Sequence, residues 1–212
     1  MKIQIIYDNE VLFDELGSDW GFSCIVEHNN RKILFDTGTN GALLLQNMKS
    51  MKIDPTSIDT VFISHSHFDH SGGLSAFLNV NPHVAVYAPP PLRGIHPAKK
   101  VIYVEDYIKI DDCFHSTGLL KDIEQSLVIN TEKGLVLVVG CSHPGLEVIL
   151  NASKELGKPY MVAGGLHGFD DYKLLEEFKF ICPTHCTQNI KKIKELYPDK
   201  YIQGGAGKVI EL

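Results

Sequence analysis

One short stretch of the chain, His65 to Gly73, concentrates the residue types that bind metal ions. It holds three imidazoles and one carboxylate within six positions: His65, His67, Asp69 and His70. Nitrogen and carboxylate ligands together favour Zn, Fe, Mn or Ni over Ca or Mg. A histidine-rich loop that binds nothing is the alternative, but four potential ligands at this spacing rarely occur by chance.

The elements around this stretch are expected to hold it at the end of a strand. The apolar run Thr60 to Ser64 predicts a buried strand, and Gly72-Gly73 leads into an expected helix. Residues two apart in an extended chain point the same way, so His65 and His67 can bind one ion. Asp69 and the histidine after it follow a bend and can face a second ion.

Three later loops repeat the order of apolar strand, small residues and histidine. They contain His143, His167 and His185, so four loops together hold six of the ten histidines. We expect these loops to converge on one metal site. The other four histidines lack this setting and are expected on the surface or in packing contacts: His28, His83, His96 and His115.

Strand and helix patterns alternate along the whole chain, which predicts one α/β domain over residues 1–212. Asn29-Asn30 predicts a two-residue hairpin turn, and Asn40 is the expected cap of a helix to about Met51. A second hairpin ends in the buried strand Leu135–Val139 and, like the first, is followed by a loop of ligand-type residues. We therefore expect a pseudo-duplicated architecture. Another helix is expected from Asp170 or Asp171 to about Phe178.

Composition limits the classes of protein that the chain can represent. The 212 residues are 44% hydrophobic and 22% charged, with a net charge of −6, which disfavours general binding to nucleic acid or anionic membranes. No run approaches the roughly 20 apolar residues of a membrane span. The five cysteines, an odd number, favour reduced thiols in a cytoplasmic protein. The oligomeric state stays open.

Several motifs together resemble the metallo-β-lactamase superfamily, in particular its subgroup of dihydropterin-ribofuranosylaminobenzene 5′-phosphate synthase-like proteins. The shared segments are the stretch from His65 to His70, Tyr7–Asn9, Ile33–Gly38, Gly140–Gly145, Gly164–His167 and Pro183–Thr187. The resemblance implies the αβ/βα sandwich, with two mixed sheets face to face, helices outside and a binuclear metal site at one edge. Zinc is the implied cofactor, with Mn, Fe or Ni as alternatives.

The resemblance also implies roles for individual residues. His65, His67 and His143 match the ligands of a first metal, and Asp69, His70 and His185 match those of a second. Asp36 matches the residue that supports the metal loop, which fits a carboxylate that accepts the outer N–H of a ligand histidine.

The chain departs from the family pattern at several positions near the expected site. His167 stands where most hydrolases of the superfamily have an aspartate that bridges two metals, and Asp170 is an outside candidate for that role. His167 could instead bind substrate or act as an acid or base. Asp19-Trp20 and Gln188 replace an expected Glu-His and glycine, and the segment after Pro91 is short.

Two cysteines and one asparagine have open roles. Cys141 lies two positions before His143 and Cys186 follows His185, and thiolates bind zinc well. Because neighbours in an extended segment point to opposite sides, we expect Cys186 to face away from the site. Asn9 could donate to substrate as part of an oxyanion site, or it could be an ordinary turn residue.

The expected function is a metal-dependent hydrolase that uses a metal-activated water on an ester, phosphoester or related bond. Asp69 and His167 are the expected catalytic groups, and the partner is a small-molecule substrate, with a phosphorylated one among the options. The subgroup implies a pterin-linked phosphoribosyl-type synthase as a variant. The alternatives are a di-iron redox or oxygen-handling protein and a metal- or ligand-binding protein without turnover.

Overall fold

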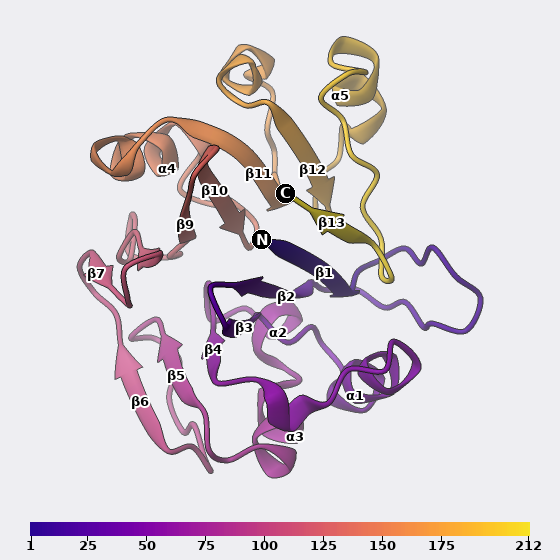
Figure 1. The fold of residues 1–212 in the computed structure, drawn as a ribbon, viewed down its shortest axis with the longest axis vertical. Helices are drawn as coiled ribbons and strands as arrows, with labels where there is room; N and C mark the ends of the chain where they lie inside the picture. The colour runs from indigo at the N-terminus through magenta and orange to yellow at the C-terminus, as the bar shows by residue number, and fades with distance from the viewer.

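The computed structural model describes all residues from 1 to 212 and consists of two sheets packed face to face (Figure 1). The first sheet has seven strands in the order β13-β1-β2-β3-β4-β5-β6, and the second has six in the order β12-β11-β10-β9-β8-β7. Both sheets mix parallel and antiparallel pairs. The expected αβ/βα sandwich is therefore confirmed.

The first sheet is built from both ends of the chain. Its strands are β1 (Lys2–Tyr7), β2 (Ser23–His28), β3 (Arg31–Phe35), β4 (Thr60–Phe62), β5 (Ala85–Ala88), β6 (Lys100–Tyr103) and β13 (Val209–Glu211). The last strand pairs with the first, so the two termini lie side by side at one edge (Figure 1).

The second sheet comes from the C-terminal half. Its strands are β7 (Ile108–Lys109), β8 (Phe114–Ser116), β9 (Leu127–Thr131), β10 (Gly134–Val139), β11 (Pro159–Gly165) and β12 (Phe180–Thr184). Strand β10 shows why apolar runs mark these central strands. Val136 and Val138 face the core between the sheets, whereas Leu137 and Val139 face the outer helices. A strand covered on both faces is apolar throughout.

Helices cover the outer face of each sheet. They are α1 (Gly41–Ser50), α2 (Phe68–Ser71), α3 (Leu74–Val80), α4 (Leu146–Ser153) and α5 (Ile190–Leu196), with short 3-10 segments at Pro55–Ser57, Lys154–Leu156 and Tyr172–Glu177. Leu44 of α1 and Phe77 of α3 pack on the first sheet, and Ile149 of α4 and Ile193 of α5 on the second. None of these helices has the length and apolar character needed to cross a bilayer.

Local signals in the sequence account for several boundaries. Asn29 and Asn30 both adopt positive φ, at 47° and 62°, as the predicted two-residue turn requires. Asn40 caps α1 through its side chain, as expected. The helix expected before Phe178 is wrong in type: Tyr172–Glu177 forms 3-10 turns, and the Asp171 side chain makes no cap hydrogen bond.

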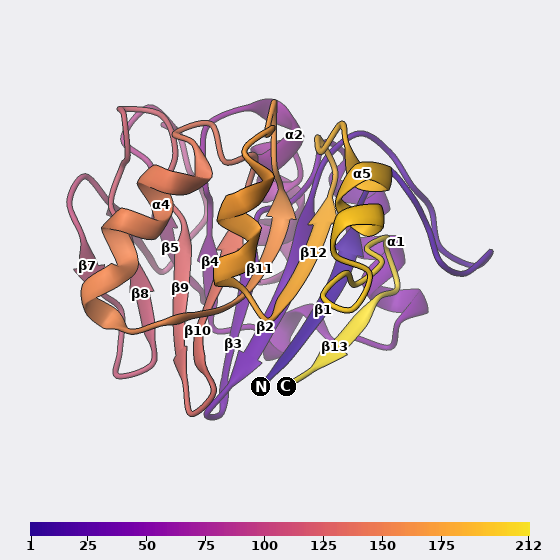
Figure 2. The same ribbon diagram turned by 90° about the horizontal axis from the view of Figure 1, so that it is seen from above.

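The two halves repeat one arrangement, as the paired hairpins suggest. Hairpin β2–β3 leads into the parallel series β3-β4-β5, and hairpin β9–β10 leads into β10-β11-β12. Carboxyl ends of parallel strands meet at one edge of a sheet. The loops that follow these strands therefore gather at the same end of the sandwich, seen at the top of Figure 2 near α2.

Candidate metal centre

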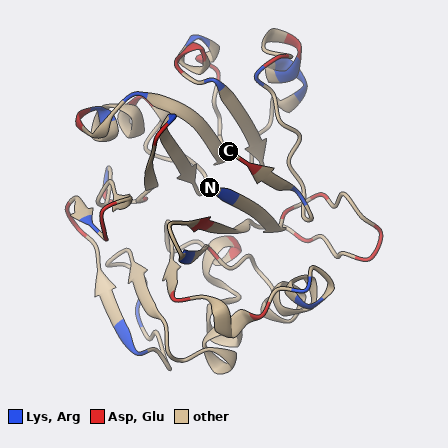
Figure 3. Ribbon diagram, in the orientation of Figure 1, with Lys and Arg blue, Asp and Glu red and all other residues tan.

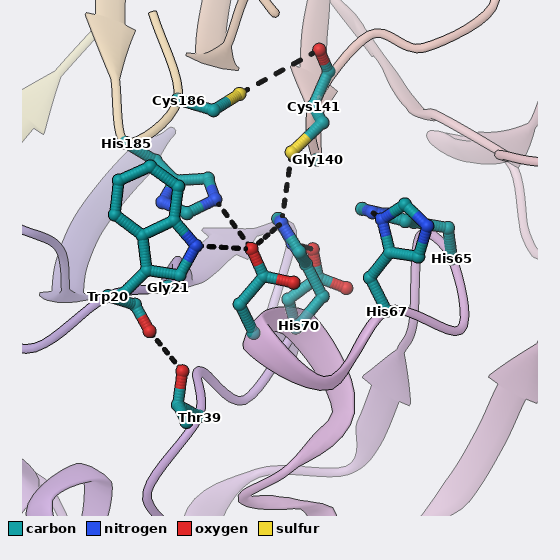
Figure 4. Close-up of polar contacts among 12 residues, drawn as sticks. Trp20, Gly21, Thr39, His65, His67, His70, Gly140, Cys141, His185 and Cys186 are labelled. Atoms are coloured by element: carbon teal, nitrogen blue, oxygen red, sulfur yellow. Dashed lines mark hydrogen bonds and ion pairs between the residues drawn. The ribbon is translucent and has the colours of Figure 1, made fainter.

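Six of the predicted ligands come together in two groups at this end of the sandwich. We call His65, His67 and His143 the first cluster, and Asp69, His70 and His185 the second cluster. Within each cluster the three ligand atoms lie within 4.8 Å of one another. The rings of His65 and His70, one from each cluster, have their centroids 4.2 Å apart, so the clusters adjoin (Figure 4).

The Asp36 carboxylate fixes two of the imidazoles, and all three side chains are buried. Its Oδ2 lies 2.7 Å from Nδ1 of His70 and also accepts the hydroxyl proton of Ser64. Because the Ser64 hydroxyl donates there, its oxygen accepts from Nδ1 of His65 at 2.9 Å. Both rings therefore carry their proton on Nδ1 and direct the lone pair of Nε2 into the centre.

Asn9 fixes the His185 ring in the same way. Its Oδ1 accepts from the Gly21 amide at 3.1 Å, and its Nδ2 donates to the His185 carbonyl at 3.0 Å, so the orientation of the amide is determined. Nδ1 of His185 lies 3.0 Å from the same Oδ1 and must be the donor. Asn9 thus braces His185 with both of its side-chain atoms.

Electron-rich atoms then face each other across the centre. Nε2 of His185 lies 3.2 Å from Oδ2 of Asp69 without a hydrogen bond, and Nε2 of His143 is buried without a partner. Nε2 of His65 lies 3.0 Å from Nδ1 of His67, and a hydrogen bond joins the two when the His67 proton is on Nδ1. Two ligands on one tetrahedral zinc ion are separated by about 3.3–3.6 Å, so these pairs fit an ion after shifts of a few tenths of an ångström.

The protonation states also suit a divalent cation. Burial lowers the pKa of His65, His70 and His143, which keeps these rings neutral and their lone pairs available. Neutral imidazoles with one ionised carboxylate fit zinc or a similar transition metal.

Trp20 covers the second cluster from the loop between β1 and β2. Its indole N–H donates to Oδ2 of Asp69 at 2.9 Å, and its ring centroid lies 4.8 Å from that of His185 (Figure 4). The hydroxyl of Thr39 donates to the Trp20 carbonyl. The side chain is nevertheless 56% exposed, so it sits at the mouth of the centre. Its position agrees with the expectation that this departure lies near the site.

Glu124 supports the His143 loop, and sequence reasoning missed it. The carboxylate is buried and accepts four backbone N–H bonds, from Gly140, Cys141, Ser142 and His143, at 2.9 to 3.0 Å. Burial raises its pKa to about 7, although these hydrogen bonds oppose the shift. The only signal in the sequence is an acidic residue a few positions before a buried strand, which has no specific meaning by itself.

Asp8 has the same relation to the His185 loop. Its buried Oδ1 accepts from the His185 amide at 3.0 Å and from the Asn9 amide at 2.7 Å. Burial raises the pKa of Asp8 to about 6. Each of the three ligand-bearing loops is therefore held by one buried carboxylate: Asp36, Glu124 or Asp8.

His167 and Asp170 lie at the rim and belong to neither cluster. The His167 side chain is exposed, its ring centroid is 5.2 Å from that of His143, and its backbone N–H donates to the Cys141 carbonyl. Asp170 is also exposed. The structure thus brings six predicted ligands together and leaves these two residues beside them.

The expectation that Cys186 faces away from the site is wrong. Cys141, His185 and Cys186 have ligand atoms within 4.8 Å of one another, and both thiols are buried. The reason is that His185 has φ of +50°, in the left-handed region, so its neighbours do not alternate as in a strand. Ser142, between Cys141 and His143, has φ of +60° and redirects its loop in the same way.

Two hollows flank the clusters. One has a volume of about 390 Å³ and is lined by His185, Asn9, Asp8 and Glu10 among others. The other has a volume of about 210 Å³ and includes His167, Ser142, Glu147 and Asp170. No lysine or arginine lines either hollow, so the protein offers carboxylates and polar groups there rather than fixed positive charge.

The sequence of the chain matches the family model described as the metallo-beta-lactamase superfamily over residues 21–151, more than half of its length. This chain belongs to that superfamily. The match covers the expected ligands from His65 to His143, and the last one, His185, lies beyond it.

Known proteins resemble the chain over nearly its full length. A 7,8-dihydropterin-6-methyl-4-(beta-D-ribofuranosyl)-aminobenzene-5′-phosphate synthase from Methanocaldococcus jannaschii is 27% identical, with 92% of this chain and 90% of the relative covered. A crystal structure of a metal-dependent hydrolase of the beta-lactamase superfamily has a TM-score of 0.82 at 24% identity, with 100% and 99% covered. Zinc-bound PqqB from Methylobacterium extorquens has a TM-score of 0.69 at 9% identity, with both chains fully covered. These two structures share the fold.

Proposed function

We propose that this protein is a metal-dependent hydrolase of an ester or phosphoester bond in a small molecule. The observation that carries the proposal is the pair of adjoining clusters, in which ring nitrogens and a carboxylate oxygen face one another at 3.0–3.2 Å. A divalent ion, with zinc as our first choice, would be held by His65, His67 and His143 or by Asp69, His70 and His185. It would supply Lewis-acid polarisation of the scissile bond and a lowered pKa for water.

The residues of the chain have separate tasks in this proposal. Asp69 accepts from the Trp20 indole and keeps further lone pairs for an ion or for a proton from water. His167, exposed at the rim beside His143, can give a proton to a leaving group that lies in the smaller hollow. Asn9 binds His185 rather than serving as an oxyanion donor.

The charge distribution bears on the substrate. The loop between β1 and β2 carries acidic residues and no basic ones, whereas lysines gather on α5 (Figure 3). Since neither hollow has a lysine or arginine, a phosphorylated substrate would have its charge met by the bound ions. The acidic surroundings disfavour a nucleic-acid substrate. Five free thiols are consistent with a reducing cytoplasm.

A pterin-linked phosphoribosyl-type synthase is the second candidate. It is favoured by one observation, the 27% identity to the archaeal synthase over 92% of this chain. The same metal centre would serve either reaction, so the two candidates differ in substrate rather than in the residues that we assign.

The test combines metal content with turnover on a panel of carboxylic esters, phosphomonoesters and phosphodiesters. We expect bound zinc or manganese and hydrolysis of at least one ester class. Stoichiometric metal with no turnover on any class would favour a binding protein, and iron with a visible absorbance band would favour a redox protein. His167→Ala should reduce turnover more than metal content; an equal loss of both would show His167 to be a ligand.

A further inference from the structure

The Cys141 thiol lies at the junction of the two clusters. Its Sγ is 3.2 Å from Nε2 of His70, and it groups within 4.8 Å with His65 and His70 on one side and with His185 and Cys186 on the other (Figure 4). No other side chain outside the clusters groups in this way with members of both. The residue is 3% exposed, so the thiol has no alternative contact with bulk water.

The His70 ring is oriented so that it needs a partner at this point. Nδ1 of His70 bonds to Asp36 at 2.7 Å, which leaves Nε2 as the lone-pair nitrogen. Its hydrogen-bond partner is the Cys141 sulfur at 3.2 Å, which is closer than Oδ2 of Asp69 at 3.9 Å. A zinc ion bound by one sulfur and one nitrogen separates the two atoms by about 3.5 Å. The observed pair is thus close to the spacing of two ligands on one ion.

The surrounding backbone holds the thiol in this direction. Glu124 accepts the N–H groups of Gly140, Cys141 and Ser142 on a single oxygen, which fixes the loop that presents the sulfur. Gly165 leaves room behind it, because a Cβ there would lie 2.6 Å from the Cys186 sulfur and 3.3 Å from the Cys141 Cα. A donor held in place before the ion arrives loses little entropy on binding.

We propose that Cys141 is a thiolate ligand of the metal centre, shared between the two clusters. The inference rests on the proposed metal centre and adds a sulfur donor to its set of nitrogens and oxygens. When the ion binds, the S–H bond breaks, a sulfur–metal bond forms, and the proton leaves to solvent; no oxidation state changes. A sulfur donor favours zinc over manganese or magnesium.

Cys186 provides the matched control. It is buried beside Cys141 and, although its sulfur groups with His185, its hydrogen-bond contact is with the Cys141 carbonyl at 4.0 Å and not with a member of either cluster. We therefore expect Cys186→Ser to leave the ligand set unchanged, whereas Cys141→Ser removes the sulfur.

The experiment uses the full chain loaded with Co²⁺ under reducing, anaerobic conditions, because a thiolate on cobalt gives a near-ultraviolet charge-transfer band. We expect this band in the unaltered protein and in Cys186→Ser, and its loss in Cys141→Ser with cobalt still bound. Bound cobalt without the band, or a band that disappears only in Cys186→Ser, would overturn the inference and leave the proposed hydrolase centre intact. Failure to bind cobalt at all would remove the centre itself.

A second measurement keeps the inference testable if Cys141→Ser does not fold. X-ray absorption at the zinc edge of the unaltered protein should show a sulfur neighbour at about 2.3 Å, and Cys186→Ser should keep it. A shell of nitrogen and oxygen only would overturn the proposal.

Discussion

The two clusters adjoin each other but differ in charge, burial and support. The first consists of imidazoles alone, with His67 exposed and His143 only half-buried. The second contains the Asp69 carboxylate, and the side chains of His70 and His185 are fully buried. In the second cluster Nδ1 of each ring bonds to Asp36 or Asn9, whereas in the first only the His65 ring is fixed in this manner.

This difference predicts which of the two clusters binds an ion first. Hydrogen bonds to the outer nitrogen of a ligand histidine fix its tautomer and orientation, and their loss typically costs about 10–100-fold in metal affinity. A carboxylate ligand also offsets part of the ion's charge in a buried setting. We therefore expect the second cluster to be the tighter site and the first to fill at higher metal concentration.

The largest effects should come from removing one imidazole of each cluster. His70→Ala should weaken the tighter site beyond the roughly 10–100-fold expected for losing an outer partner, because it removes the ligand itself. His67→Ala should keep the tight ion and lose the weaker one. Zinc titration against a competing chelator measures both affinities. If His67→Ala lost the tight ion and His70→Ala kept it, the first cluster would be the tighter site, which contradicts our expectation.

Asp36→Asn should have the next largest effect. The change keeps the size of the side chain but turns the carboxylate partner of Nδ1 of His70 into an amide, so affinity at the second cluster should fall about 10–100-fold. Asp54→Asn is the control, because Asp54 is an exposed cap of the 3-10 turn at Pro55–Ser57 and contacts neither cluster. Equal metal affinity in the two variants would contradict the role of Asp36.

Glu124, which holds the His143 loop of the first cluster, can be tested through the pH dependence of the stability of the metal-free protein. Burial raises the pKa of Glu124 to about 7 from 4.5, so the folded state keeps a proton that the unfolded state has already lost. This contribution to stability is present below pH 4.5 and is lost as the pH rises through about 7, a change of about 3 kcal/mol.

The Glu124→Gln variant lacks this contribution to stability. The buried histidines contribute an opposing pH dependence, but it is common to both proteins and cancels when the two are compared. Denaturant unfolding between about pH 4 and pH 8 should show the unaltered protein losing about 3 kcal/mol relative to the variant. A constant difference across this range would show that Glu124 is not protonated on folding. The variant should also bind the second-cluster ion normally, because its contacts lie on the His143 loop.

The smallest effect is expected at the mouth. Trp20→Phe removes the N–H donor to Asp69 and keeps an aromatic ring over His185, so affinity at the second cluster should change by roughly tenfold. Trp20 is the only tryptophan, so in the unaltered protein its fluorescence should report the arrival of an ion. A change of 100-fold or more would make Trp20 a principal support of the site.

The parts of this site that could be predicted from the sequence are those marked by a local pattern of residues. The spacing of His65, His67, Asp69 and His70 is a property of six residues, and the strand-end position of the later histidines follows from apolar runs. The fold followed from those runs together with the family motifs.

The remaining contacts depend on tertiary structure. Glu124 lies 19 positions from His143, and Asp8 lies 177 positions from His185, so no spacing rule connects them. The direction of the Cys186 side chain depends on the left-handed conformation of His185, a conformation that is uncommon outside glycine. These contacts form only when the folded chain places the first strand beside the last loops.

The most direct test is an anomalous difference map of a crystal grown without chelators and soaked with less than one equivalent of zinc. We predict the strongest peak among the ligand atoms of Asp69, His70 and His185. A peak only among His65, His67 and His143, or no peak at this end of the sandwich, would contradict our account.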